Sequence, residues 1–201
     1  TLAVLHLGGY TGRKVDKEIT EETAERYKAD TKDSGTYSKQ AVGKSFLKPV
    51  QQEASLATRT HRLLTLPWED KGPRILSNSG YIYYTEQMRL RRLSYMAKGK
   101  EMAMQADAIK QEAKQRLGNM FDADDYLSEA QILERFYFDV EIKGVPEAGD
   151  FRSKLSDASV KAIVKDIERR GDERLQAAMN DVFERVLTVT GKLVDSLKNY
   201  K

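Results

Sequence analysis

The 201-residue sequence contains no cysteine and only two histidines, and these shortages exclude several kinds of site. Without a thiol the chain has no disulfide, no thiolate metal ligand and no cysteine nucleophile. A zinc site would also need a third histidine. His6 lies in an apolar segment and His61 lies on the apolar face of an expected helix, so neither is placed to activate a serine. We therefore expect a protein that is not an enzyme and that has no metal and no cofactor.

The sequence also lacks a long hydrophobic run. No stretch approaches the roughly 18 apolar residues that a membrane-spanning helix needs. The chain does not open with the charged and apolar pattern of a signal peptide. These features, together with the missing cysteines, predict a cytoplasmic protein that does not contact a membrane, and the length of 201 residues predicts a single domain over residues 1–201.

Charge is abundant but unevenly distributed. The net charge of +3 includes a basic central region, since residues 39–100 hold 12 Lys and Arg against 4 Asp and Glu. A basic region beside an acidic C-terminal half indicates either a polyanion-binding face or two halves that attract each other across copies. An unevenly charged but simply solvated surface explains the same counts.

Hydrophobic periodicity predicts an α+β fold that is predominantly helical. Apolar residues recur every three or four positions over 156–197, so this last helix should bury one face. We expect the helix predicted at 80–117 to be its partner in a long antiparallel hairpin. Further helices are predicted near Thr20, from Pro49 and over 128–135.

A small sheet completes the expected fold. Residues 1–7 are almost wholly apolar, and residues 136–142 alternate between apolar and polar. Pairing these two segments gives a two-stranded sheet, and residues 74–76 would make it three-stranded. Residues 28–45 have no sustained apolar period, and we predict a mobile loop there.

Two short motifs have chemical interest, each with a plain structural alternative. Gly8 and Gly9 end the first predicted strand and are followed by Arg13 and Lys14, which is chemistry that can hold a phosphate. The spacing is not that of a Walker A loop, and a simple strand-to-helix turn has the same composition. The acidic cluster at 122–125 could hold a hard cation, but acidic residues before a helix also complement its dipole.

The basic region interleaves cations with aromatic rings, as single-strand binders do, with cations following the phosphates and rings stacking on bases. Trp68, between two prolines, could equally be a buried plug. The candidate contacts are Arg13, Lys14, Arg59, Arg62, Trp68, Lys71, Arg74, Tyr83, Arg89 and Arg92.

Three blocks of the sequence resemble a known family. They are the opening LHLGGYTGRKVDK, the segment LPWEDKGPRIL and the long block from Arg116 to Leu155. In this order they are similar to bacteriophage and prophage proteins that share a domain of unknown function. The resemblance implies a phage protein encoded near DNA-metabolism genes or near MoxR-type AAA+ ATPases, and it assigns no functional residue.

Two hypotheses follow. The first is a phage DNA-metabolism protein that binds single-stranded DNA, as an oligomeric annealing or recombination protein. The alternative is a helical assembly or adaptor protein that self-associates or has a protein partner such as an AAA+ ATPase. Both hypotheses include a homo-oligomer.

Overall fold

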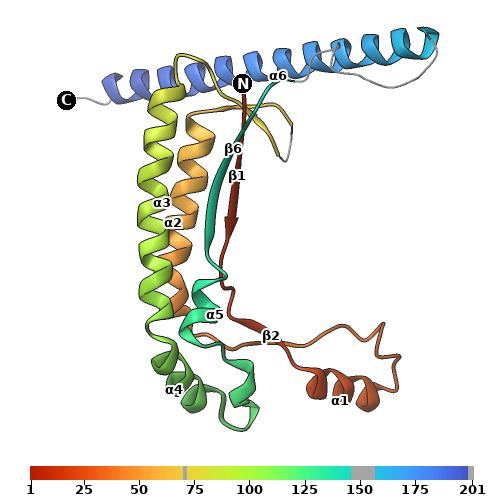
Figure 1. Cartoon of the computed structure of the whole chain (residues 1–201), viewed down its shortest axis with the longest axis vertical. Coiled ribbons are helices and arrows are strands. Elements are labelled where there is room, and N and C mark those ends of the chain that lie inside the picture. The colour runs from red at the N-terminus through yellow and green to blue at the C-terminus, as the bar shows by residue number, and fades with distance from the viewer. Residues whose placement is uncertain (70–71, 146–156, 199–201) are drawn as a thin grey trace. The chain divides into compact units, whose positions relative to one another are not determined.

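The computed structural model describes residues 1–69, 72–145 and 157–198 (Figure 1). Close contacts divide the chain into two compact units. Unit 1 comprises residues 1–6, 58–88 and 140–201, and unit 2 comprises residues 7–57 and 89–139. In chain order the elements are β1 (Leu2–Gly8), β2 (Arg13–Val15), α1 (Lys17–Tyr27), β3 (Ser38–Gln40), α2 (Lys44–Leu63), β4 (Leu66–Pro67), β5 (Arg74–Ile75), α3 (Tyr81–Ala103), α4 (Ala106–Leu117), the 3-10 turns η1 (Gly118–Met120) and η2 (Ala123–Asp125), α5 (Glu129–Leu133), β6 (Tyr137–Lys143) and α6 (Asp157–Lys198).

The predicted α+β, predominantly helical fold is confirmed, and the sheets are larger than expected. One sheet has four strands in the order β4-β5-β1-β6, and a second sheet pairs β2 with β3. The predicted pairing of the first strand with 136–142 is confirmed, since β1 lies between β5 and β6. Strand β4 was missed because it is two residues long and contains Pro67, which is tolerated because β4 is an edge strand.

Several boundaries differ from prediction for local reasons. Helix α1 begins three residues before Thr20, because the Asp16 side chain caps it by accepting from the Ile19 N–H. Helix α2 begins at Lys44 rather than at Pro49, which lies inside it. The predicted loop at 28–45 is therefore shorter than expected, and β3 lies within it. Its mobility stays a prediction.

The predicted hairpin was wrong in its partner. The region 80–117 is two helices, α3 and α4, which separate where the Gln105 N–H bonds the Met102 carbonyl at 3.1 Å. No glycine or proline marks this break in the sequence. Gly118 does end α4, at φ 55°, as predicted. The helix that meets α3 in unit 1 is α2, through His61 and Tyr84.

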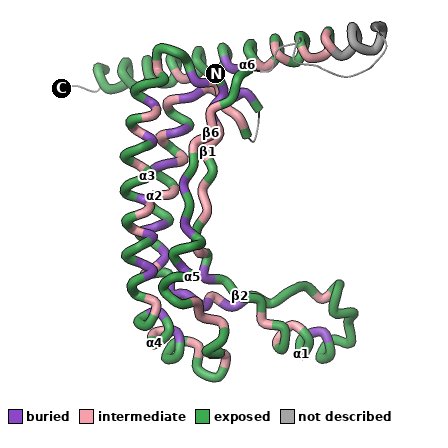
Figure 2. Tube along the Cα trace, viewed as in Figure 1, coloured by how far each residue is buried: buried purple, intermediate pink, exposed green. Residues whose placement is uncertain are grey.

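Helix α6 forms where predicted, but its apolar stripe is not buried. Figure 2 shows most of the described part of α6 as exposed. Phe183 is 62% exposed and Val186 57%, whereas Ala178 is 1% exposed. The α6 residues that pack on the rest of unit 1 are mainly polar, and they include Arg174 and Arg185. None of the described helices is both long enough and apolar enough to cross a bilayer.

The core of unit 1 contains a histidine in a hydrogen bond. Nδ1 of His61, on α2, lies 2.8 Å from the hydroxyl oxygen of Tyr84, on α3, and both residues are buried. Burial, and then the charges of Arg74 and Arg62, lower the pKa of His61 from 6.5 to about 4. His61 is therefore neutral in the folded protein at physiological pH.

This buried histidine predicts a pH dependence of stability. Because the folded pKa lies below the unfolded value, the unfolded chain takes up a proton first as the pH falls. The contribution of His61 is complete above about pH 6.5 and is lost as the pH falls through about 4. We expect His61 to lower the free energy of unfolding by up to about 3 kcal/mol over that range.

The measurement is urea unfolding of the wild type and of His61→Gln between pH 4 and pH 7.5. The variant keeps a hydrogen-bonding side chain but cannot titrate, so the stability difference between the two proteins should shrink as the pH falls. A difference that stays constant across this range would contradict the prediction.

Candidate functional site

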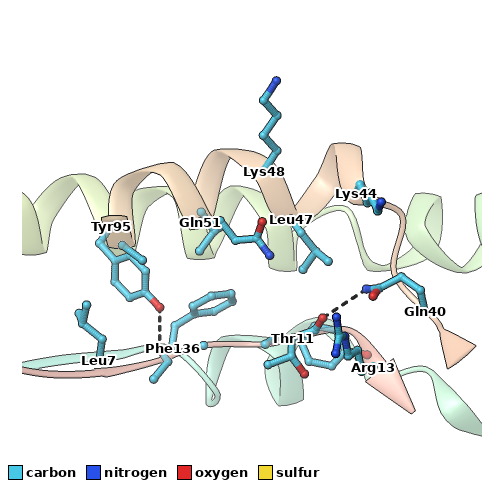
Figure 3. A pocket seen from close by; sticks show the side chains of 15 residues that line it. Leu7, Thr11, Arg13, Gln40, Lys44, Leu47, Lys48, Gln51, Tyr95 and Phe136 are labelled. Atoms are coloured by element: carbon cyan, nitrogen blue, oxygen red, sulfur yellow. Dashed lines mark hydrogen bonds between the residues drawn. The ribbon is translucent and has the colours of Figure 1, made fainter. Parts of the chain in front are cut away.

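A basic pocket in unit 2 is the candidate functional site. It has a volume of about 750 Å³, within the usual range for ligand pockets. Its walls come from the end of β1 and the following turn, from β2 and β3, from the start of α2, and from one side chain each of α3 and the segment before β6 (Figure 3). The charged residues that line it are Arg13, Lys44 and Lys48, and no acidic side chain is among its described lining residues.

The small sheet of unit 2 places Arg13 at the pocket. Arg13 on β2 pairs with Gln40 on β3 in an antiparallel register. The Gln40 amide Nε2 donates to the carbonyls of Thr11, Gly12 and Val42 at 3.1 to 3.4 Å. Gln40 therefore holds the turn before Arg13 against the segment that leads into α2.

The start of α2 supplies the opposite wall. Lys44, Leu47, Lys48 and Gln51 recur at helical spacing, and the first turn of the helix has no acidic residue. In Figure 3, Leu47 and Gln51 point toward the turn after β1, while Lys48 extends away from it. The Lys48 ammonium therefore points away from the base of the pocket.

Arg116 of α4 fixes the chain just before α2. Its guanidinium donates to the Gln40 and Ala41 carbonyls, both at 2.9 Å, and it pairs with Glu112 at 2.8 Å. The Glu112 carboxylate lies close to Gly43, the residue before α2, where an added Cβ would be 3.1 Å from it. The Glu112 carboxylate therefore balances part of the positive charge at the N-terminal end of the α2 dipole. The charged side chains that line the pocket are Arg13, Lys44 and Lys48.

Aromatic side chains form the floor of the pocket. The Tyr95 hydroxyl on α3 donates to the Gly8 carbonyl at 2.7 Å. Burial, and then the charge of Tyr137, raise the pKa of Tyr95, so this hydroxyl stays protonated. The Tyr95 and Phe136 rings meet edge to face at 6.0 Å. A Cβ at Gly9 would lie 2.7 Å from the Tyr95 hydroxyl oxygen, so glycine permits the close approach of this turn to the floor.

Beside the pocket, a buried lysine organises the second sheet. The Lys39 ammonium, 7% exposed, lies 3.0 Å from Asp16, 2.9 Å from Asp125 and 2.8 Å from the Met120 carbonyl. Burial alone would lower the pKa of Lys39, but the hydrogen bonds and charges of Asp125 and Asp16 outweigh it and raise this pKa. Lys14 reaches Asp125 from outside at 3.3 Å.

Two neighbouring hollows in unit 2 carry mixed charge. One is lined by Lys39, Lys114, Glu18, Asp122 and Asp125 among others, and a smaller one sets arginines beside Asp125. Anions are repelled by such carboxylates, so the basic pocket is the better anion site. In the acidic cluster at 122–125, Asp122 caps η2, and across the described residues no three His, Asp or Glu side chains gather as metal ligands.

Four of the sequence-predicted contacts lie in unit 2. Arg13 lines the basic pocket, and Lys14 is exposed but paired with Asp125. Arg89 and Arg92 are exposed on α3. Of these four, only Arg13 is a lining residue of the pocket.

The other described contacts lie in unit 1. Arg59, Arg62 and Tyr83 are exposed, the last by 60%. Trp68 is 8% exposed, and the Arg174 guanidinium lies over its ring at 5.2 Å. Trp68 is therefore buried in its loop, as in the second of the two alternatives for this residue, and its ring is not open to a base.

Arg74 is engaged within unit 1 as well. Its side chain donates to the Thr65 hydroxyl at 2.8 Å and to the carbonyls of Thr65 and Arg62 at the end of α2. Arg74 thus donates to one carbonyl of the last turn of α2, that of Arg62, and to one just beyond the helix, that of Thr65. Lys71 lies outside the described residues.

Sequence analysis missed the residues that complete the pocket with Arg13. Lys44 and Lys48 have i, i+4 spacing directly after Gly43, and glycine is one of the residues that can precede a helix. The low apolar content of 28–45 hid this helix start. Nothing in the sequence pointed to Gln40 or Tyr95, because their roles depend on contacts with distant segments.

Comparison with protein-family models, with curated proteins and with solved structures found no match for this chain.

Two glycines of unit 2 that have positive φ should differ in how much stability an alanine substitution costs: Gly12, in the turn before Arg13, and Gly118, at the end of α4. Gly12 has φ 63°, and a Cβ there would lie 2.4 Å from Cβ of the buried Val42. Gly118 has φ 55°, but a Cβ there meets no atom within 4 Å. Gly118→Ala should cost about 1–3 kcal/mol of unfolding free energy from backbone strain, because φ 55° with ψ −126° is a conformation that L residues rarely adopt. Gly12→Ala should cost about 1–3 kcal/mol more, from overpacking.

Urea unfolding of both variants measures this difference. The two substitutions share the chemistry and the sign of φ, so Gly118→Ala is the control for strain alone. Equal losses for the two variants would mean that Val42 moves aside without cost, against the prediction.

Proposed function

We propose that this chain is a non-enzymatic nucleic-acid-binding protein that holds the phosphate backbone of single-stranded DNA at the basic pocket of unit 2. The observation that carries the proposal is the pocket lining, whose described charged residues, Arg13, Lys44 and Lys48, are all basic. Cations without a carboxylate among them suit a chain of phosphates, which binds by releasing counterions.

The pocket fits a polymer better than a nucleoside triphosphate. It has no Walker A spacing among its glycines, and its floor rings, Tyr95 and Phe136, are buried and packed on each other. No base can stack between them as they stand. Of the two aromatic contacts predicted from the sequence, Trp68 and Tyr83, Tyr83 in unit 1 is the exposed one and stays a candidate for stacking on a base.

Further phosphate contacts come from exposed arginines of the basic region. We assign Arg89 and Arg92 of unit 2, and Arg59 and Arg62 of unit 1, to this supporting role. Trp68 and Arg74 are left out, because their polar or aromatic surfaces are already occupied inside unit 1. The resemblance to phage proteins suggests DNA annealing or recombination as the setting of this binding.

The experiment is fluorescence anisotropy with labelled single- and double-stranded DNA over a salt series. In Arg13→Ala/Lys44→Ala we expect single-strand binding to weaken by about tenfold or more, because two charged contacts are lost. The slope of log affinity against log salt should become shallower by about 1.4, which corresponds to two phosphates. Circular dichroism checks that the variant is folded.

The matched control is Lys100→Ala/Lys110→Ala, which removes two exposed cations of unit 2 that do not line the pocket. This control should change affinity and slope much less. Equal effects of the two double variants would reject the pocket as the binding site. An undetectable affinity of the wild type for either DNA near 100 mM salt would reject the proposed function.

The alternative, a helical assembly protein, is favoured by a separate observation. Helix α6 presents a continuous apolar face to solvent. DNA binding and self-association are compatible, because the pocket residues all belong to unit 2 and α6 belongs to unit 1.

A further inference from the structure

A small hollow of about 240 Å³ lies beside the basic pocket in unit 2. Its walls come from the turn after β1, from Asp125 and Leu127, and from Arg135 after α5. The residues that line both the small hollow and the basic pocket are Gly9, Tyr10, Thr11 and Arg13. Both spaces therefore border the same turn. The small hollow is below the roughly 300–1,000 Å³ of drug-sized ligand sites, so it suits a single ring system.

The polar side chains of the small hollow include both an acceptor and a donor. The Asp125 carboxylate lies 2.9 Å from the Lys39 ammonium and 3.3 Å from that of Lys14. Because a carboxylate has about four acceptor positions, Asp125 can still accept from a ligand. Arg135 is exposed and has no ion pair among the described residues, so its guanidinium can donate.

Tyr10 supplies an aromatic ring to the small hollow. The other two rings of the basic pocket, Tyr95 and Phe136, pack on each other, whereas no described aromatic ring packs on Tyr10. Burial raises the pKa of Tyr10, and the charges of Arg135 and Asp125 act on this pKa in opposite directions. The Tyr10 hydroxyl therefore stays protonated at neutral pH, close to the donor and the acceptor of the small hollow.

A nucleobase has the surfaces that this lining would bind, since its faces are apolar and its edge carries hydrogen-bond donors and acceptors. In a nucleotide one sugar separates the base from the phosphate, so the two groups need neighbouring sites. A phosphate at the basic pocket and a base in the small hollow meet this requirement across the shared turn. The Asp125 carboxylate disfavours a phosphate in the small hollow, but it does not repel a neutral base.

We propose that the small hollow receives one unpaired nucleobase of the bound strand, stacked on the Tyr10 ring with its edge toward Asp125 and Arg135. This inference rests on the proposed binding of single-stranded DNA. It supplies a physical reason for a preference for single strands, because a base in a duplex must leave its stack and its pair before it can enter a pocket. The phosphates are present in both forms and do not distinguish them in this way.

The first test compares a labelled single-stranded oligonucleotide with an abasic strand of the same length and the same phosphates. Fluorescence anisotropy measures the binding of both strands to the wild type. We expect the abasic strand to bind about fivefold or more weakly, because it has no base to stack. Equal affinities would overturn the base site and leave the phosphate pocket standing. A failure to bind either strand would reject the proposed function, and this inference with it.

Tyr10→Leu tests whether the base-dependent part of the affinity comes from the small hollow. Leucine keeps an apolar side chain in the turn but has no aromatic face. The variant should bind the oligonucleotide about fivefold or more weakly than the wild type does, and the abasic strand within about twofold of it. Its preference for single- over double-stranded DNA should fall by the same factor. Tyr10→Phe keeps the ring and should retain the base dependence.

Tyr27→Leu is the matched control. Tyr27 is a 73% exposed tyrosine of unit 2 that is not a lining residue of either space, so this variant should bind both strands as the wild type does. Circular dichroism checks that the variants are folded. Equal losses in Tyr10→Leu and Tyr27→Leu would overturn the proposal, and so would a Tyr10→Leu protein that keeps the full base dependence.

A second measurement on the wild type does not depend on the folding of any variant. A single strand with 5-iodouracil in place of thymine is bound and irradiated, and the cross-linked residue is located by mass spectrometry of the digested protein. We expect a cross-link at Tyr10, because this photochemistry joins the base to the aromatic ring on which it stacks. Cross-links confined to other residues, such as Tyr83, would overturn the assignment of the base to the small hollow.

Discussion

The buried ammonium of Lys39 is the interaction on which unit 2 depends. It is held by two carboxylates and a carbonyl, at 2.8 to 3.0 Å, from two segments that are distant in the sequence, one at Asp16 and one at 120–125. Removing one partner would leave charges that are costly to bury, which makes this arrangement all-or-none. Asp16 also caps α1, and its pKa is lowered first by the hydrogen bond from Lys39, so the cap stays ionised at neutral pH. One cation thus fixes β3, the start of α1 and the turn η2.

The position of the basic pocket follows from this anchoring. Strand β3 pairs with β2, which places Arg13, and the chain continues from Gln40 directly into α2, which places Lys44. Arg116 ties the same connection to α4 through two carbonyls. Three carboxylates near the pocket are held in ion pairs: Asp16 and Asp125 with Lys39, Asp125 also with Lys14, and Glu112 with Arg116. The cations that remain at the pocket face solvent without a carboxylate among its described lining residues.

The sequence predicted what depends on local pattern, and it missed what depends on distant partners. The α+β class, the two strands β1 and β6 and the helix from 157 follow from periodicity alone. The β2–β3 sheet could not be predicted, because it relies on a lysine buried by carboxylates that lie far along the chain. Likewise Arg13 was found through its glycine neighbours, whereas the contribution of Lys44 emerges only when α2 is seen to begin there.

Helix α6 packs through its polar face and exposes its apolar face, and the surface that it packs on explains why. The end of α2 offers the Arg62 carbonyl, and the edge beside β4 offers Glu69 and the Trp68 ring, so the helix that lies there must present cations. Arginine serves this purpose, since its planar group can donate to a carbonyl or carboxylate and stack on a ring. Ala178 lets the backbone approach closely between the arginines. With the polar face used for packing, the apolar face turns outward, and burying it requires a surface from outside the described chain.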